Sequence, residues 1–417
     1  MVTALTAAGV LVAVFVGFNI GGSSTGVAFG PSVGSRLVRK VTAATLFTSF
    51  ALVGAWTVGR NVIETMSSSI VPASQFSPVA SVGVLFFTGI SLLISNLYGV
   101  PASTSMTAVG AIVGLGLATG TLNGALMFTI VSAWIVAPLV GLVIGAVIGR
   151  YVYPQLEVRL SFTRLERQLI QVDRSGRVPR VRFNRNAAPR DLVGSALVLG
   201  IACYMGFSAG ASNAANAVAP LVGNGAVSVD QGVLLAVGAI SLGGFTIARR
   251  TLATVGDGIT DLPILAALIV STVGATIITV LSYYGIPASL AVSTTCCIIG
   301  LGWGRASRAV TLAELAIPPS EAEPGPTLTT DALAAPSTEE DGPAGPTVGE
   351  LASGEAPDTA DRPDEPPPVP PIGEEDIEEL TAGSLFDPAA TSRILALWVL
   401  TPSLSVVGSY LLFALLL

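Results

Sequence analysis

The sequence predicts an all-α integral membrane protein with two repeats of inverted topology, broken helices or hairpins at the midplane and about ten membrane segments. Three observations predict this architecture: an apolar composition, duplicated landmarks, and basic residues that change sides between the copies. Residues 1–149 form the first transmembrane repeat and residues 191–310 the main part of the second. A basic cytoplasmic loop (150–190), an acidic insertion (311–388) and a final helix (389–417) complete the expected organisation.

The composition is that of a chain dissolved in lipid. Apolar residues make up 51% of the sequence, charged residues 11%, and the mean hydropathy is +0.73, whereas soluble proteins carry about 25% charged residues. Several stretches approach the roughly 20 apolar residues that cross a hydrocarbon core. The clearest are 2–19, 41–59, 79–96, 125–149, 192–207, 232–248, 262–284 and 394–417. The first has no positively charged start and no small-residue cleavage pattern, so we expect a retained helix rather than a signal peptide.

Several landmarks occur in the same order in both parts of the chain, which is the mark of an internal repeat. The first is a segment of small residues, GGSSTGVAFGPSVGS in one copy and GASNAANAVAPLVGNG in the other. A Tyr-Gly-aliphatic-Pro-Ala-Ser sequence follows, and a helix with Trp and Pro four residues apart closes each copy. The matched positions are Gly21/Gly210, Arg60/Arg249, Thr65/Thr254, Ile70/Ile259, Pro101/Pro287, Trp134/Trp398 and Pro138/Pro402.

The insertion in the second copy is acidic. Residues 312–387 contain 19 of the 27 acidic residues and a single base, Arg362, which gives a net charge of −18. Its few large apolar residues cannot bury enough surface to offset chain entropy, so we expect a disordered cytoplasmic tether. A specific binding tail is the alternative.

The basic residues define the expected orientation. Ten arginines lie between Arg150 and Arg190, and basic loops beside membrane helices stay in the cytoplasm. Basic residues follow the small-residue motif in the first copy and the second hairpin in the second copy, while the matching segments have none. We therefore expect a multi-pass protein of the cell membrane, with both termini outside and the basic loop and acidic insertion inside. A nucleic-acid partner is not expected.

The residue types also exclude classes of function. The chain has no histidine, and Cys203, Cys296 and Cys297 lie in apolar runs, so neither a disulfide framework nor a metal site is indicated. No nucleophile and base are paired. We expect no enzyme, no metal and no cofactor.

The repeated motifs instead favour binding of an anion. Broken helices at corresponding places of two inverted halves indicate a site near the midplane, and a helix N-terminus there offers free N–H groups and the positive end of a dipole. Pro101 and Pro287 suit such helix starts, and hydroxyl groups follow directly. Small residues that merely let helices pack closely are the alternative interpretation.

These motifs resemble those of the inorganic phosphate transporter (PiT) family, whose repeats carry GANDVANA-type and PVSTTH sequences. GASNAANA, beginning at Gly210, is similar to the first, and PASTSM, beginning at Pro101, to the second; PASLAV, beginning at Pro287, is a weaker copy. The resemblance implies a homodimeric carrier that takes up phosphate with cations. The substrate-binding residues that it implies are Ser23, Ser24, Ser103, Thr104, Ser105, Ser212, Asn213, Asn216 and Ser289.

The chain departs from the family pattern at the positions of its aspartates, which are Ser24 and Asn213 here. The resemblance implies a weak cation site at Ser24, Asn213 and Asn216, with sodium or a proton as the coupling ion. Phosphate uptake is the first hypothesis, and a permease for sulfate or another oxyanion is the second. A transport-inactive membrane sensor is the third. Glu64 is a candidate partner for Arg60.

Overall fold

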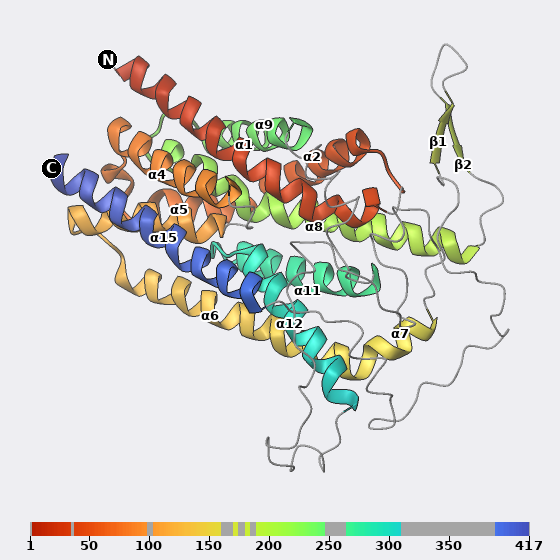
Figure 1. Ribbon diagram of the computed structural model, residues 1–417. Coiled ribbons are helices and arrows are strands. Elements are labelled where there is room, and N and C mark those ends of the chain that lie inside the picture. Colours follow the sequence, from red (N-terminus) through yellow and green to blue (C-terminus); the bar gives the residue numbers. More distant parts are fainter. Residues whose placement is uncertain are drawn as a thin grey trace, which may run out of the picture.

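The computed structural model describes residues 2–34, 37–97, 103–159, 170–173, 180–183, 189–246, 264–309 and 388–416, and these are almost entirely helical (Figure 1). The first part of the chain contains α1 (Val2–Gly34), α2 (Lys40–Thr57), α3 (Gly59–Glu64), η1 (Thr65–Ser69), η2 (Ala73–Gln75), α4 (Pro78–Leu97), α5 (Thr104–Thr119), α6 (Gly124–Val147), η3 (Ile148–Val152) and α7 (Tyr153–Arg159). The second contains β1 (Ile170–Asp173), β2 (Arg180–Phe183), α8 (Pro189–Gly223), α9 (Val229–Thr246), α11 (Ile264–Tyr283), α12 (Leu290–Ala309) and α15 (Pro388–Leu416).

The prediction of an all-α membrane protein is confirmed. Seven of the described helices are long and apolar enough to cross a membrane, and α2 with the α3–η1 segment, bent by 61°, makes an eighth. The expected number of about ten depends on counting α5, which has 16 residues, and α12, which begins after the second break. Both termini lie at the same end of the helices, away from the β1–β2 hairpin (Figure 1).

Many hydroxyl groups inside these helices are satisfied locally. Thr25, Thr88 and Thr401 are buried, and each donates to the backbone carbonyl four residues earlier at 2.8–2.9 Å. A hydroxyl that bonds within its own helix costs little in lipid, where no water is available to pair with it. Helix α8 lies at the centre, because every residue from 208 to 221 is buried.

The two halves make reciprocal contacts across the interface between them. Helix α1 packs on α9, and α8 packs on α2 (Figure 1). A Cβ at Gly21 of α1 would overlap the carbonyl oxygen of Ile240 in α9. At the matching place, a Cβ at Gly210 of α8 would overlap the carbonyl oxygen of Ala51 in α2. Gly210 lies 189 positions after Gly21, and Ile240 lies 189 positions after Ala51. Exchanging the two halves of the chain therefore turns each of these contacts into the other.

The hairpin helices repeat this reciprocity. Helix α5 packs on α15 and α12 packs on α6, and both pairs are brought together by glycine. Gly114 of α5 faces the carbonyl oxygen of Val406, while Gly300 of α12 faces that of Leu142. Leu142 and Val406 occupy matching positions relative to Trp134 and Trp398. Contacts of this kind are self-complementary, as in an isologous interface.

The close approach at Gly210 supplies a stability test. We expect Gly210→Ala to lower the unfolding free energy in detergent by about 1–3 kcal/mol, because the added methyl group must push α2 and α8 apart. Gly200→Ala is the matched control on the same helix, since nothing lies within 4 Å of its added Cβ. Thermal unfolding followed by fluorescence measures both, and equal melting temperatures for the two variants would contradict the packing described here.

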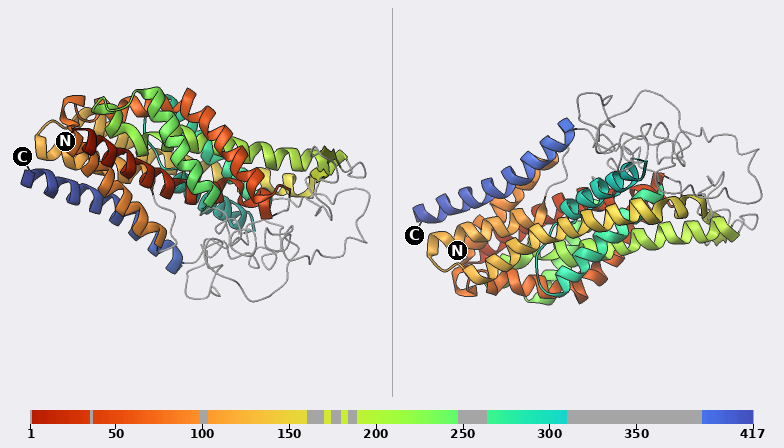
Figure 2. Two further views of the ribbon diagram at one scale, coloured as in Figure 1. Left: turned by 90° about the horizontal axis from the view of Figure 1, so that it is seen from above. Right: turned by 90° about the horizontal axis from the view of Figure 1, so that it is seen from below.

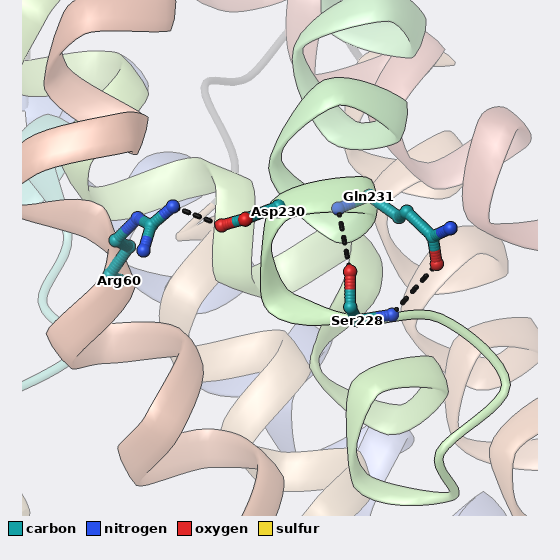
Figure 3. A network of polar contacts seen from close by, with 4 residues as sticks. All are labelled: Arg60, Ser228, Asp230 and Gln231. Atoms are coloured by element: carbon teal, nitrogen blue, oxygen red, sulfur yellow. Dashed lines mark hydrogen bonds and ion pairs between the residues drawn. The ribbon is translucent and has the colours of Figure 1, made fainter.

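Three features differ from the sequence expectation. The segment expected to be a loop from Arg150 onward continues as helix through η3 and α7, and β1 pairs with β2 in an antiparallel hairpin. Arg60 pairs with Asp230 at the start of α9, not with Glu64 (Figure 3). The acidic insertion from 311 to 387, Arg249 and Pro101 lie outside the described residues.

The negative charge of Asp230 is favourable both to Arg60 and to the helix on which Asp230 lies. Asp230 lies in the first turn of α9, where a carboxylate is favourable to the helix dipole. Arg60 also lies over the ring of Trp56, 4.6 Å from its centroid. Ser228 and Gln231 close the same turn through two bonds, one from each backbone N–H to the other's side chain (Figure 3).

Candidate functional site

The candidate site lies where the start of α5 meets the centre of α8. Helix α8 contributes Ser212, Asn213 and Asn216, whose exposed fractions are 1%, 6% and 1%. Residues three and four apart share a helix face, so Asn216 lies beside both Ser212 and Asn213. Small residues surround them, which lets the neighbouring helices approach the α8 backbone.

Two pairs of side chains join α8 to α5. The Thr104 hydroxyl donates to Asn213 Oδ1 at 2.7 Å. Asn216 Nδ2 donates to Ser105 Oγ and to Asn213 Oδ1, both at 3.2 Å. The structure therefore brings together the two motifs that the sequence analysis singled out, one from each half of the chain.

Three buried oxygen atoms on these residues have no hydrogen-bond partner among the described residues. They are Ser103 Oγ, Ser212 Oγ and Asn216 Oδ1. Leaving a buried polar atom unpaired costs free energy; the other unpartnered buried hydroxyls, such as those of Ser91, Thr279 and Ser405, lie on other helices. Three of them on residues that adjoin the bonded pairs indicate a place that a polar ligand completes.

The first turn of α5 adds backbone donors. Its first intrahelical bond runs from the Thr107 N–H to the Ser103 carbonyl at 3.0 Å. The N–H groups of residues 104–106 thus have no acceptor within the helix. The side chain of Ser103 does not cap them. Free N–H groups at the positive end of a helix, next to unpaired hydroxyls, suit an anion.

The remaining predicted residues lie elsewhere. Ser23 and Ser24 are half-buried on α1, and the Ser23 hydroxyl donates to the Ile20 carbonyl at 3.1 Å. Ser289 precedes α12 and accepts from the Val292 N–H at 3.4 Å. In the described part of the chain, no hydrogen bond joins Ser23, Ser24 or Ser289 to the cluster on α5 and α8.

Comparison of the two copies explains this asymmetry. The repeat places Ser24 and Val27 opposite Asn213 and Asn216, and Leu290 and Ala291 opposite Thr104 and Ser105. Val27, Leu290 and Ala291 have apolar side chains, so none of them can make the hydrogen bonds of its counterpart. Val27 is also 49% exposed. The polar junction therefore exists in one copy only.

The cluster contains no charged side chain. Among the residues described, no three His, Cys, Asp or Glu side chains could together hold a metal ion. Oxygens for a hard cation are nevertheless present, because Asn213 and Asn216 each present an amide oxygen and hydroxyls lie next to them. These neutral oxygens are the ligands that the cluster offers to a cation.

Sequence reasoning missed a second polar contact on α1. Asn19 is 4% exposed, and Asn96 Nδ2 at the end of α4 donates to its Oδ1 at 3.2 Å. Each asparagine interrupts an apolar stretch, which was the available signal. The bond connects the first motif helix to the segment that leads into the first hairpin.

Comparison with known proteins places these features in a family. A solved structure described as the sodium-dependent phosphate transporter matches with a TM-score of 0.58 and 21% identity, over 75% of this chain and 92% of that one, and so shares its fold. The sulfate permease CysP of Bacillus subtilis is 30% identical over 300 residues, 72% of this chain and 77% of its own. A putative phosphate permease of Haemophilus influenzae is 25% identical over 367 residues, 72% of this chain and 87% of its own.

The family model described as the phosphate transporter family matches residues 20–316, which include both small-residue motifs and both hairpin helices. That range covers most of the chain and the whole of the polar junction between α5 and α8. The chain belongs to the phosphate transporter family.

Proposed function

We propose that this protein is a secondary-active transporter that takes up a tetrahedral oxyanion, inorganic phosphate first, through a site between α5 and α8. The observation that carries the proposal is that two buried hydroxyls, Ser103 at the start of α5 and Ser212 on α8, have no partner among the described residues, while the first N–H groups of α5 have no acceptor within that helix. A tetrahedral oxyanion accepts hydrogen bonds from several directions. Hydroxyl and backbone donors can supply them without burying an unpaired lysine or arginine.

Sulfate is the second candidate, because the relative that is 30% identical is named a sulfate permease. Phosphate near neutral pH carries an O–H donor, which a buried site must match with an acceptor. Asn213 Oδ1 already accepts two bonds, but Asn216 Oδ1 is buried and has no partner among the described residues. The phosphate proton can be placed there, whereas sulfate, which has no proton, would leave this acceptor unpaired.

Uptake of a divalent anion requires coupling. Moving two negative charges inward against 100 mV, inside negative, costs about 4.6 kcal/mol at roughly 2.3 kcal/mol per charge. We propose co-transport of sodium or protons, with sodium held by amide, hydroxyl and carbonyl oxygens. The structural relative named a sodium-dependent phosphate transporter supports sodium as the first ion to test.

We further propose alternating access by two inverted repeats, in a homodimer of the cell membrane. Support for the inverted repeats comes from the reciprocal glycine contacts and from the opposite directions of two matching helices: α1 begins at the end of the molecule that carries both termini, whereas α8 begins at the other end (Figure 2). In such folds, broken helices at the repeat interface hold the substrate while the halves rock around it.

Orientation can be measured at Ser228, an exposed residue in the turn before α9 (Figure 3). We expect a Ser228→Cys variant to react with a membrane-impermeant maleimide added to intact cells, because this turn is at the end of the molecule that carries the termini. A parent without the new cysteine is the control. Labelling only after the cells are opened would reverse the proposed orientation.

Uptake into proteoliposomes tests the function directly. The purified protein is reconstituted, and labelled phosphate and labelled sulfate are supplied under sodium, proton or no gradient. We expect saturable uptake of one anion that the other inhibits and that a cation gradient stimulates. Binding of an anion without uptake under any gradient would favour a membrane sensor, and neither binding nor uptake would reject the anion site.

A further inference from the structure

The turn between α11 and α12 breaks the helix within the apolar part of the second half. Gly285 has a φ of +73°. Its N–H donates to the Ser282 carbonyl at 3.0 Å, and the Ile286 N–H donates to the Leu281 carbonyl at 2.9 Å. This pair of bonds is the Schellman ending of a helix, for which glycine is the preferred residue. The turn thus satisfies part of its own backbone.

Two carbonyl groups of the turn are satisfied from outside it. Asn61 Nδ2 of α3 donates to the Tyr283 carbonyl at 2.7 Å. The indole Nε1 of Trp134, on α6, donates to the Pro287 carbonyl, also at 2.7 Å. Both donors belong to the first half of the chain, while the turn belongs to the second. Nothing in the function proposed above uses either of them.

Helix α3 is packed directly against the turn. A Cβ at Gly285 would lie 2.6 Å from Thr65 Oγ1 and 3.1 Å from the Asn61 carbonyl oxygen. The turn is therefore enclosed between the α3–η1 segment and α6. The turn ends at Ser289, which is 5% exposed and whose hydroxyl oxygen accepts a hydrogen bond from the Val292 N–H in the first turn of α12.

The second closing tryptophan occupies a related place. Trp398 is 8% exposed and belongs to a small buried cluster with Val292 and Leu397, against which Met106 packs. Met106 and Val292 lie in the first turns of α5 and α12. Both tryptophans that close the repeats thus lie at the starts of the broken helices, which gives these recurrent landmarks a structural role.

We propose that Trp134 is a positioning residue for anion transport, assisted by Asn61: its indole N–H fixes the Pro287 carbonyl and thereby places the first turn of α12. Val292 in that turn belongs to the buried cluster against which Met106 packs, and Met106 follows Thr104 and Ser105 of the candidate site in the first turn of α5. This inference rests on the proposed function. In lipid, a carbonyl that loses its donor has no water to replace it. The turn must then rearrange to find another partner, and the start of α12 moves with it.

The test compares Trp134→Phe with Trp303→Phe. The first removes the N–H while keeping an aromatic ring. The second is a matched control, because Trp303 is 58% exposed on α12. We expect Trp134→Phe to raise the KM for the transported anion about tenfold, which is about 1.4 kcal/mol, with Vmax within about twofold, because the displaced start of α12 disturbs its packing with Met106 beside the hydroxyls of α5. Trp303→Phe should change neither. Asn61→Leu should act in the same direction and less strongly, because Asn61 is exposed.

A purely structural role gives a different result. It would lower the amount of folded protein and Vmax in proportion and leave KM unchanged, and that outcome would overturn the proposal. Hydrogen exchange supplies a readout that does not depend on transport. Peptides spanning residues 283–292 should exchange faster in Trp134→Phe than in Trp303→Phe. Equal exchange would reject the role of Trp134 even if the parent protein carried no anion, whereas a parent without uptake but with the exchange difference would reject only the proposed function.

Discussion

Replacing Ser103 and Ser212 together by alanine should raise the anion concentration for half-maximal uptake by about a hundredfold or more. Each hydroxyl is buried and has no partner among the described residues, so each is available to donate to an anion. A hydrogen bond to a charged group contributes about 1.5–3 kcal/mol, a factor of at least ten per hydroxyl. Each single variant should therefore raise this concentration about tenfold. Labelled-anion uptake into proteoliposomes measures all three proteins.

Ser208→Ala is the matched control for this pair. Ser208 lies one turn before Ser212 on the same helix and is equally buried, but its hydroxyl donates to the Ala275 carbonyl at 3.0 Å. We expect a modest loss of thermal stability and an unchanged KM. If Ser103→Ala and Ser212→Ala both transported with the parental KM, the assignment of the anion site to the junction between α5 and α8 would be wrong.

The second large effect is expected from Asn213→Asp, which introduces a carboxylate where the resemblance in motif implies an aspartate. Asn213 is 6% exposed, so a negative charge there would be poorly screened. At an effective dielectric constant of about 20 and a separation of about 5 Å, repulsion between unit charges is about 3 kcal/mol. Anion uptake without sodium should fall more than a hundredfold. Sodium should restore much of it, because the cation offsets the new charge. Uptake with sodium and with choline as the external cation measures both effects.

Ser24→Asp is the control at the matching position of the other copy. Ser24 is half-buried on α1, and no described contact joins it to the polar junction. The same charge there should change anion uptake far less and create a weaker sodium requirement. Equal responses of the two variants would mean that both copies contribute to the site, contrary to the asymmetry seen here.

Local patterns in the sequence predicted much of the fold and part of the site. The recurrence of Gly21 at Gly210 was visible as spacing, and both glycines lie at matching helix crossings. Asn213 and Asn216 on one side and Thr104 and Ser105 on the other were candidates from their motifs, and they are hydrogen-bonded to each other. Their role in transport stays a prediction.

Contacts between residues distant in sequence could not be predicted. Arg60 lies four residues from Glu64, its candidate partner, but it pairs with Asp230, 170 positions away in the sequence. Trp134 was noticed as a landmark, yet its bond to the Pro287 carbonyl spans 153 positions and depends on how α6 packs on α12. No single-sequence pattern records which backbone carbonyl a helix break leaves unpaired.

The reciprocal contacts have an evolutionary consequence. An interface that maps onto itself when its halves are exchanged is one that two identical subunits could make. In a pair of identical subunits every substitution is present twice, so a change at the position of Asn213 would alter both faces at once. Joining two copies in one polypeptide removes that constraint, so Leu290 and Ala291 can be apolar while Thr104 and Ser105 keep their hydroxyls. A single polypeptide thus lets one face carry polar chemistry while the other keeps the shared packing.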